Sequence, residues 1–359
     1  MEFMEPEFVG FEDGRRVALP LDFPPPLILP CTMEKLRVIT VDYGTSLYFF
    51  VDGGQPGLYA GVVESYCLLD STSDNVYEIE EKHIKETLYG TIHRGWILQR
   101  IDENTATRTS DMYQVAIKKY DRVSVESKVR ADDPLQEFAA LQFIGPHPNV
   151  ISQITCYGDD DSFYSIMPFC DGADICEAVL GNGPMSEVSA KYMCLQFLDA
   201  MEHIQQFGVF HRDISMENVM VLDDDRLVLI DFGMSVRLPL DEETGEPYLI
   251  PAMTPMGKQK YIAPEVLAAS GAYDGYRADI WACGILLFVL LSCKFPVGQA
   301  SPLCPFYRKV EEGYLREMCT HWKLGLSPQC ADLLYRMLQA DPNNRPTIQQ
   351  IRSHPWFSM

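Results

Sequence analysis

Two short polar motifs near the middle of the chain constrain its fold more than any other feature. The first is HRDISMENV at residues 211–219, and the second is DFG at residues 231–233, which follows the strand-like run RLVLI. Asp213 supplies a carboxylate that can accept a proton, and Asn218 supplies an amide oxygen on the same short loop. Asp231 adds a second oxygen ligand of the kind that Mg²⁺ prefers. The pattern is typical of a site that holds a divalent cation beside a general base.

Three further elements stand in a fixed order around these motifs. Upstream, the apolar run VAIK ends in Lys118, and Glu137 lies on the helix that we expect to follow. Downstream stands YIAPE at residues 261–265. A lone HRD, DFG or VAIK arises readily by chance, and a lone Glu137 is an ordinary helix residue, but the five elements together make coincidence negligible.

On these five elements the chain resembles the eukaryotic protein kinase family, of the serine/threonine type. The resemblance covers residues 86–357 and includes HPNVI at residues 147–151 and DIW at residues 279–281. It implies an α+β, two-lobed protein kinase fold, with a small β-rich lobe, a larger helical lobe, and ATP with Mg²⁺ in the cleft between them. The reaction that it implies is transfer of the γ-phosphoryl group of ATP to a protein hydroxyl.

The resemblance also assigns roles residue by residue. Lys118 would hold the α- and β-phosphates and pair with Glu137, Asp213 would be the catalytic base, and Asn218 and Asp231 would be the Mg²⁺ ligands. The residues that it places around the nucleotide are Gly90, Gly95, Ile97, Ala116, Lys118, Met167, Phe169, Cys170 and Asp174. It further implies that Asp279 supports the catalytic loop and that Arg345 pairs with Glu265.

The glycine-rich loop departs from the family pattern. The segment LYGTIHRGWI keeps Gly90 and Gly95 but has Ile92 where the family has its middle glycine. A β-branched side chain there hinders close approach of the backbone to phosphate. The polar run at residues 102–111, which follows, is predicted to be an inserted turn.

A second departure concerns the catalytic loop. Relatives of the serine/threonine type usually carry a lysine two residues after the catalytic aspartate, where this chain has Ser215, and a threonine where it has Lys258. We hypothesise that the two groups are exchanged, so that Lys258 supplies the missing positive charge and Ser215 the hydroxyl. The alternative is that Lys258 points to solvent, and that the chain is a pseudokinase acting as an ATP-binding or scaffolding module.

The chain divides into three predicted regions. Residues 1–85 form an acidic, proline-containing N-terminal extension with β-rich runs, which is either a small β module or a set of extra strands on the following domain. The kinase domain would span residues 86–357, with the small lobe at 86–170 and the large lobe at 171–357. Residues 280–293 are too short and interrupted to span a bilayer and are expected to form a buried helix.

Charge and cysteine content limit the partners and the compartment. With 29 basic and 51 acidic side chains the formal net charge is −22, which excludes a general nucleic-acid binder, and no membrane attachment is expected. The 11 cysteines include no CxxC pair, which favours free thiols in an intracellular, most simply cytoplasmic, location.

Acidic residues also bear on the substrate and on regulation. Residues 213–250 hold 10 acidic and 2 basic side chains, including the insertion DEETGEP, and this predicts basic peptides among the protein substrates. Thr254 matches the family's activating phosphorylation site, and Arg212 could pair with its phosphate, so we expect an upstream kinase.

Overall fold

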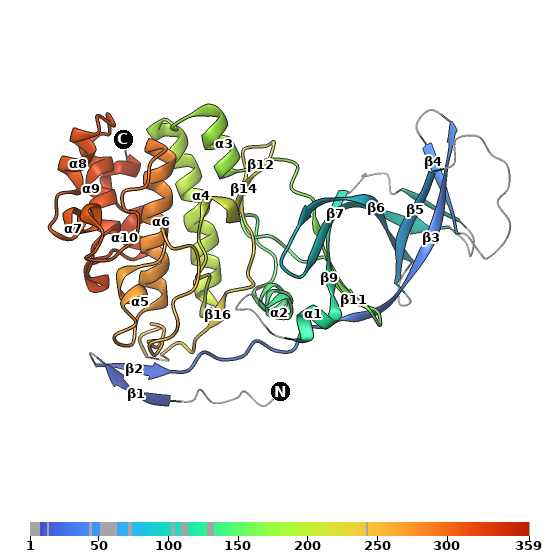
Figure 1. The fold of residues 1–359 in the computed structure, drawn as a ribbon, viewed down its shortest axis with the longest axis horizontal. Coiled ribbons are helices and arrows are strands. Elements are labelled where there is room, and N and C mark those ends of the chain that lie inside the picture. Colours follow the sequence, from blue (N-terminus) through green and yellow to red (C-terminus); the bar gives the residue numbers. More distant parts are fainter. Residues whose placement is uncertain are drawn as a thin grey trace. The chain divides into compact units, whose positions relative to one another are not determined.

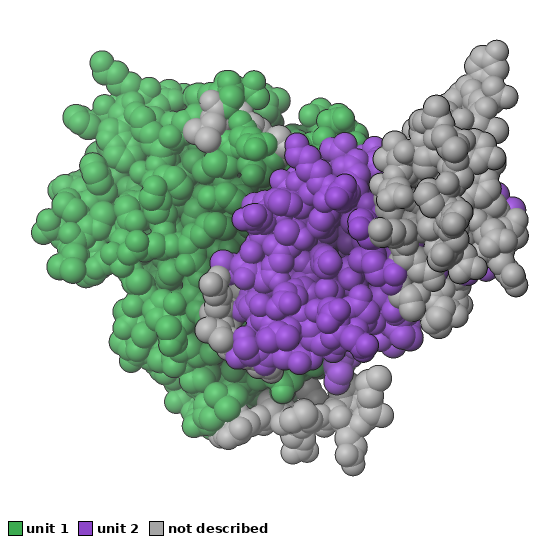
Figure 2. Space-filling view, turned by 45° about the vertical axis from the view of Figure 1, so that its right-hand side comes forward, with its two compact units in different colours: residues 1–24, 143–150, 171–359 green, residues 25–142, 151–170 purple. Residues whose placement is uncertain are grey.

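The computed structural model divides into two compact units, coloured separately in Figure 2. The small unit comprises residues 25–142 and 151–170, and the large unit comprises residues 1–24, 143–150 and 171–359. The structure describes residues 8–12, 14–42, 45–50, 63–70, 74–101, 105–108, 114–127, 133–241 and 243–358.

A single mixed sheet builds most of the small unit. Its strands are β3 (Leu29–Asp42), β4 (Thr45–Phe50), β5 (Val63–Asp70), β6 (Asn75–Glu86), β7 (Gly90–Arg100), β8 (Thr105–Arg108), β9 (Gln114–Asp121), β10 (Thr155–Gly158) and β11 (Ser162–Pro168). They lie in the order β10-β11-β9-β7-β6-β5-β3-β4-β8. The described part of the unit also contains helix α1 (Arg122–Glu126) and most of helix α2 (Pro134–Ile144).

Strand β3 closes this sheet on itself. It pairs antiparallel with β5 and, at its start, parallel with β10 through Leu29 and Pro30. The ring encloses an apolar core made of Leu68, Tyr77, Ile79, Val115, Ile117, Tyr157, Tyr164 and Ile166. The β-rich runs of residues 29–86 are therefore strands of the same sheet as β7 and β9, and not a separate module in the part of the chain described.

Strand β8 corrects the prediction of a polar turn at residues 102–111. Thr105–Arg108 pairs with β7 on one side and with β4 on the other, and Ala106 is fully buried in a cluster with Cys67, Val76 and Leu98. The remaining residues of that predicted turn lie outside those described. The strand escaped prediction because its partner β4 comes from a distant part of the chain.

The large unit is mainly helical (Figure 1). Its helices are α3 (Ile175–Asn182), α4 (Glu187–Gln206), α5 (Pro264–Ala268), α6 (Gly275–Ser292), α7 (Pro305–Glu311), α8 (Leu315–His321), α9 (Pro328–Met337) and α10 (Ile348–Arg352), with single 3-10 turns at Met216–Asn218, Pro342–Asn344 and Pro355–Ser358. Its short strands are β1 (Phe8–Glu12), β2 (Arg15–Ala18), β12 (Ala173–Asp174), β13 (Val209–Phe210), β14 (Val219–Val221), β15 (Leu227–Leu229) and β16 (Val236–Arg237).

Helix α6 is the buried helix expected at residues 280–293. It starts earlier, at Gly275, because the Asp274 side chain caps it by accepting hydrogen bonds from the amides of Tyr276 and Arg277. Within the described residues it is the one helix long and apolar enough to cross a membrane, yet most of it is buried inside the protein. It therefore serves as the core of the large unit.

Candidate active site

The small unit brings Lys118 and Glu137 together. Lys118 Nζ lies 2.7 Å from Glu137 Oε1 and 2.9 Å from Oε2, and the Tyr120 hydroxyl donates to the same carboxylate at 3.1 Å. Strand alternation on β9 buries Val115 and Ile117 in the core, so Lys118 projects from the other face. The glutamate is almost completely buried on α2, where Lys118 and the Tyr120 hydroxyl are hydrogen-bond partners of its carboxylate.

Both glycines of the expected glycine-rich loop lie in strand β7. The turn between β6 and β7 is Thr87–Leu88–Tyr89, which contains no glycine. A Cβ added at Gly90 would lie 2.0 Å from the carbonyl oxygen of Lys119, and one added at Gly95 would lie 2.2 Å from that of Glu78. These positions need glycine because neighbouring strands approach too closely, and the glycine-rich loop predicted here is wrong in its placement.

The strand register separates the residues assigned to the nucleotide into two faces. Ala116 pairs across the sheet with Met167 and with Arg94, and Lys118 pairs with Ile92, so these side chains share one face. Gly95 pairs with Val115 on the opposite face.

Ile97 belongs to the Gly95 face, where it packs against the enclosed core. The structure therefore places Gly95 and Ile97 on the face of the sheet opposite to the one that carries Ala116 and Lys118. Their assignment fails because a motif in sequence fixes spacing but not strand register.

Arg94 is the residue of this face that the sequence did not reveal. Its guanidinium stacks over the Phe169 ring, with Cζ 4.7 Å from the ring centroid. Its Nε is buried without a hydrogen-bond partner. Phe169 and Cys170 follow β11 directly, and the Phe169 amide donates to the carbonyl of Gln114 at 3.1 Å. No motif marks Arg94, so only pairing with Ala116 could have identified it.

In the large unit, the catalytic loop holds Asp213 and Asn218 in contact. Asn218 Nδ2 donates to the Asp213 backbone carbonyl and to its Oδ2, both at 2.8 Å. Arg212 adopts a left-handed φ of 67°, which turns the chain so that its amide and that of His211 both donate to Asp279. Burial raises the pKa of the Asp279 carboxyl to about 7. The predicted support of this loop by Asp279 is thus confirmed.

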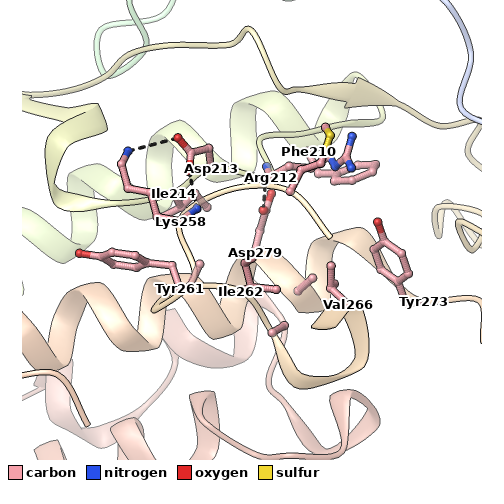
Figure 3. A pocket seen from close by; sticks show the side chains of 14 residues that line it. Phe210, Arg212, Asp213, Ile214, Lys258, Tyr261, Ile262, Val266, Tyr273 and Asp279 are labelled. Atoms are coloured by element: carbon pink, nitrogen blue, oxygen red, sulfur yellow. Dashed lines mark hydrogen bonds and ion pairs between the residues drawn. The ribbon is translucent and has the colours of Figure 1, made fainter. Parts of the chain in front are cut away.

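Lys258 contacts Asp213, the predicted catalytic base (Figure 3). Its backbone amide donates to Asp213 Oδ1 at 3.0 Å, and its Nζ donates to Asp213 Oδ2 at 3.2 Å and to Ser215 Oγ at 2.7 Å. Gly257 permits this approach because it has φ 94°, and a Cβ there would lie 2.6 Å from the Arg212 carbonyl oxygen. The two positions that depart from the family pattern are therefore in direct contact.

Asn218 and Asp231, the predicted Mg²⁺ ligands, would offer one amide and one carboxylate oxygen. The Ile230 amide donates to the Asn218 carbonyl at 2.9 Å, which places Asp231 beside the catalytic loop. Because Nδ2 of Asn218 is committed to Asp213, its Oδ1 faces away from that residue. Oxygen ligands of this kind, few in number, suit a cation that keeps several waters and binds substrate phosphates, so Asn218 and Asp231 fit the ion.

Three further predicted residues have clear structural surroundings. Asp174 caps α3 by accepting from the amide of Glu177 at 2.8 Å. Arg345, fully buried, forms a two-pronged ion pair with Glu265 at 2.6 and 2.7 Å, as predicted. Thr254 is exposed.

Comparison with known proteins agrees with this geometry. The model of the protein kinase domain matches residues 104–357, a range that begins after Gly90 and Gly95. CBL-interacting protein kinase 14 of Oryza sativa subsp. japonica is 31% identical over 243 residues, which is 68% of this chain and 52% of the relative.

Two more relatives are similar to the same extent. CBL-interacting serine/threonine-protein kinase 24 of Arabidopsis thaliana is 31% identical over 70% of this chain and 53% of its own length. CBL-interacting protein kinase 1 of Oryza sativa subsp. japonica is 33% identical over 67% of this chain and 50% of its own length. The chain thus spans about half the length of these relatives. On the family match and the similarity to these relatives, the chain belongs to the protein kinase family.

Proposed function

We propose that this chain is a serine/threonine protein kinase that uses ATP and Mg²⁺. The observation that carries the proposal is the position of the Lys258 ammonium, 3.2 Å from Asp213 and 2.7 Å from Ser215. A positive charge held beside the catalytic carboxylate stabilises the negative charge that develops on the transferred phosphoryl group. Its place next to Asp213 matters more than the residue from which it comes.

The protein groups divide the work as follows. Asp213 accepts the proton of the substrate hydroxyl, while a bond forms from that oxygen to the γ-phosphorus and the bond to the ADP leaving group breaks. Asn218 orients Asp213 through two hydrogen bonds. Lys118, fixed by Glu137, is available to the phosphates. Bound Mg²⁺ would be held by Asn218 and Asp231 and would neutralise phosphate charge.

The preference for serine and threonine rests on the catalytic loop and on the relatives. The loop reads HRDISMENV, where tyrosine kinases instead place arginine and alanine. The alternative of a pseudokinase finds no support among the relatives, which are named as kinases. Those names also mention CBL, but an interaction with CBL is not part of the proposal because the match covers only about half of each relative.

Substrates, regulation and location complete the proposal. Basic peptides are the favoured substrates because residues 213–250 are strongly acidic. Phosphorylation of the exposed Thr254 by an upstream kinase would add a charge that Arg212 can bind. The 11 cysteines, which include no CxxC pair, support a reducing, intracellular location.

The test is transfer of radiolabelled phosphate from ATP to a basic protein substrate. Asp213→Asn keeps the shape of the side chain but removes the base, and we expect the rate to fall by about 10²–10⁴-fold. A matched acidic peptide should be a poorer substrate than the basic one. Absence of transfer by the wild-type protein, with and without phosphorylation of Thr254, would refute the proposal.

A further inference from the structure

The N-terminal hairpin, β1 and β2, belongs to the large unit, whereas the extension from residue 25 onwards belongs to the small unit. Figure 1 draws it in blue beside the loops below α5. The Arg16 carbonyl accepts from the Leu249 amide at 2.8 Å, and the Ala18 amide donates to the Leu249 carbonyl at 3.1 Å. Leu249 belongs to the segment between Asp231 and Glu265, which we name the activation segment. The hairpin therefore adds a strand to the activation segment.

The other side of the same stretch is also paired. Ile250 and Tyr273 exchange two backbone hydrogen bonds, at 2.9 and 2.8 Å. Residues 249–250 are thus held between β2 and Tyr273, and both Leu249 and Ile250 are buried. A backbone fixed on two sides has less freedom than a surface loop, because opening it breaks hydrogen bonds on both edges.

Arg15 is the charged anchor of the hairpin. Its Nη1 lies 2.6 Å from Asp274 Oδ2, and its Nη2 donates to the Pro247 carbonyl at 2.5 Å. One guanidinium therefore joins the activation segment to the residue that caps α6. Asp274 is nearly buried, so the pair is shielded from water on that side. Lysine could not reproduce this two-pronged contact, because it presents a single point charge.

Two further contacts fasten the hairpin at its ends. The Glu12 carboxylate accepts from the Ala272 amide at 2.8 Å, and the Arg16 guanidinium donates to the Tyr248 hydroxyl at 2.5 Å. These contacts join β1 to the residue before Tyr273, and β2 to the residue before Leu249. The hairpin is built into the large unit by side chains as well as by backbone pairing.

The activation segment also carries Lys258, which reaches Asp213 and Ser215. We propose that the N-terminal hairpin braces the activation segment in cis, and that Arg15 is a positioning residue for phosphoryl transfer because it keeps Lys258 on Asp213. In a kinase with lysine in the catalytic loop itself, the charge would not depend on this segment. The part of the inference that concerns catalysis rests on the proposed function, whereas the brace itself does not.

Hydrogen exchange in the full chain tests the brace directly. In Arg15→Ala we expect the Leu249 and Ile250 amides to exchange about tenfold faster than in the wild type, as for loss of one charged hydrogen-bonded contact that is partly exposed. Arg15→Lys should fall between the two. Arg226→Ala, which removes an exposed arginine paired with Asp224, is the matched control and should leave these amides unchanged.

Steady-state kinetics complete the experiment. Arg15→Ala should lower kcat and leave KM for ATP nearly unchanged, because the ATP-binding lysine is not in the large unit. Unchanged exchange at Leu249 and Ile250 in both Arg15 variants would overturn the inference, even if activity fell. Faster exchange in Arg15→Ala with unchanged kcat would overturn the positioning role alone. If the wild-type protein shows no kinase activity while Arg15→Ala still exchanges faster, the result counts against the proposed function and not against the brace. If Arg15→Ala fails to fold, Arg15→Lys provides the same measurements.

Discussion

The two units depart from the family pattern in different ways. In the large unit, the lysine stands in the activation segment and the hydroxyl in the catalytic loop, the reverse of the family pattern, and the Lys258 ammonium contacts both Asp213 and Ser215. In the small unit, the turn between β6 and β7 contains no glycine, and Arg94 shares the face of Lys118. The first change keeps a positive charge at Asp213 but takes it from another segment. The second adds a guanidinium to the face that carries Lys118.

The comparison shows that a charged side chain can come from a different segment where two segments contact the same carboxylate. Asp213 is contacted by Lys258 from the activation segment and by Asn218 from its own loop. A lysine ammonium could therefore reach Asp213 from either the activation segment or the catalytic loop. A turn that uses backbone amides has no such freedom, because only residues without a side chain allow close approach. The following experiments test this contrast.

The largest effect is expected at Lys118. Lys118→Met should lower kcat by about 10³-fold, because a preorganised charge near the phosphates is removed. It should also lower the free energy of unfolding by about 3–5 kcal/mol, since the carboxylate of Glu137 is left buried with the Tyr120 hydroxyl as its remaining partner. Lys119→Met is the control, because Lys119 lies on the other face, over the Tyr164 ring. Equal activity of the two variants would contradict the role of Lys118 in binding the phosphates.

Next in size is the effect of Lys258. Lys258→Ala should lower kcat by about 10²-fold while leaving KM for ATP unchanged. The double variant Ser215→Lys with Lys258→Thr returns the two groups to the family arrangement and should recover most of the rate. Lys260→Ala, which removes a lysine that stacks on Phe295, serves as the control. A double variant no better than Lys258→Ala would show that the two positions do not compensate each other.

Asp279 should make stability depend on pH. Its folded pKa of about 7 exceeds the unfolded value of 3.8, so the folded state binds the proton more tightly. Its contribution is therefore fully present below pH 3.8 and is lost as pH rises towards 7, with a slope of at most about 1.4 kcal/mol per pH unit. Denaturant unfolding of the wild type and of Asp279→Asn across this window measures the free energy of unfolding at each pH. The dependence of this free energy on pH should be weaker in the variant. Parallel curves would contradict the raised pKa.

The smallest effect is expected at Arg94. Arg94→Val should change KM for ATP about three- to tenfold and leave kcat nearly constant, because the guanidinium shares the face of Lys118 but is remote from proton transfer. We expect the affinity to fall, since the unpartnered Nε is available to a nucleotide acceptor. Arg100→Val, at the exposed end of β7, is the control. An unchanged KM would show that Arg94 does not contribute to ATP binding.

Much of the fold could be predicted from local patterns. The segment from Ser186 forms α4 at Glu187–Gln206 with Ser186 as its cap, and the segment from Ser327 forms α9 in the same way. Strand β8 could not be predicted, because Thr105–Arg108 is polar and becomes a strand only through pairing with β4 and β7. Arg15 carried no motif, and its partners Pro247 and Asp274 are far away in sequence.

By itself, the sequence determined the reacting groups and their order, because the loop motifs around Asp213, Asn218 and Asp231 are short and their chemistry is local. It also determined that Ser215 and Lys258 depart from the family together. Only the tertiary structure decided that Lys258 reaches Asp213, that Gly95 and Ile97 face away from Lys118, and that Arg15 anchors the activation segment. These outcomes depend on strand register and on contacts between distant segments, which are set by packing of the whole chain and leave no periodic or local trace in the sequence.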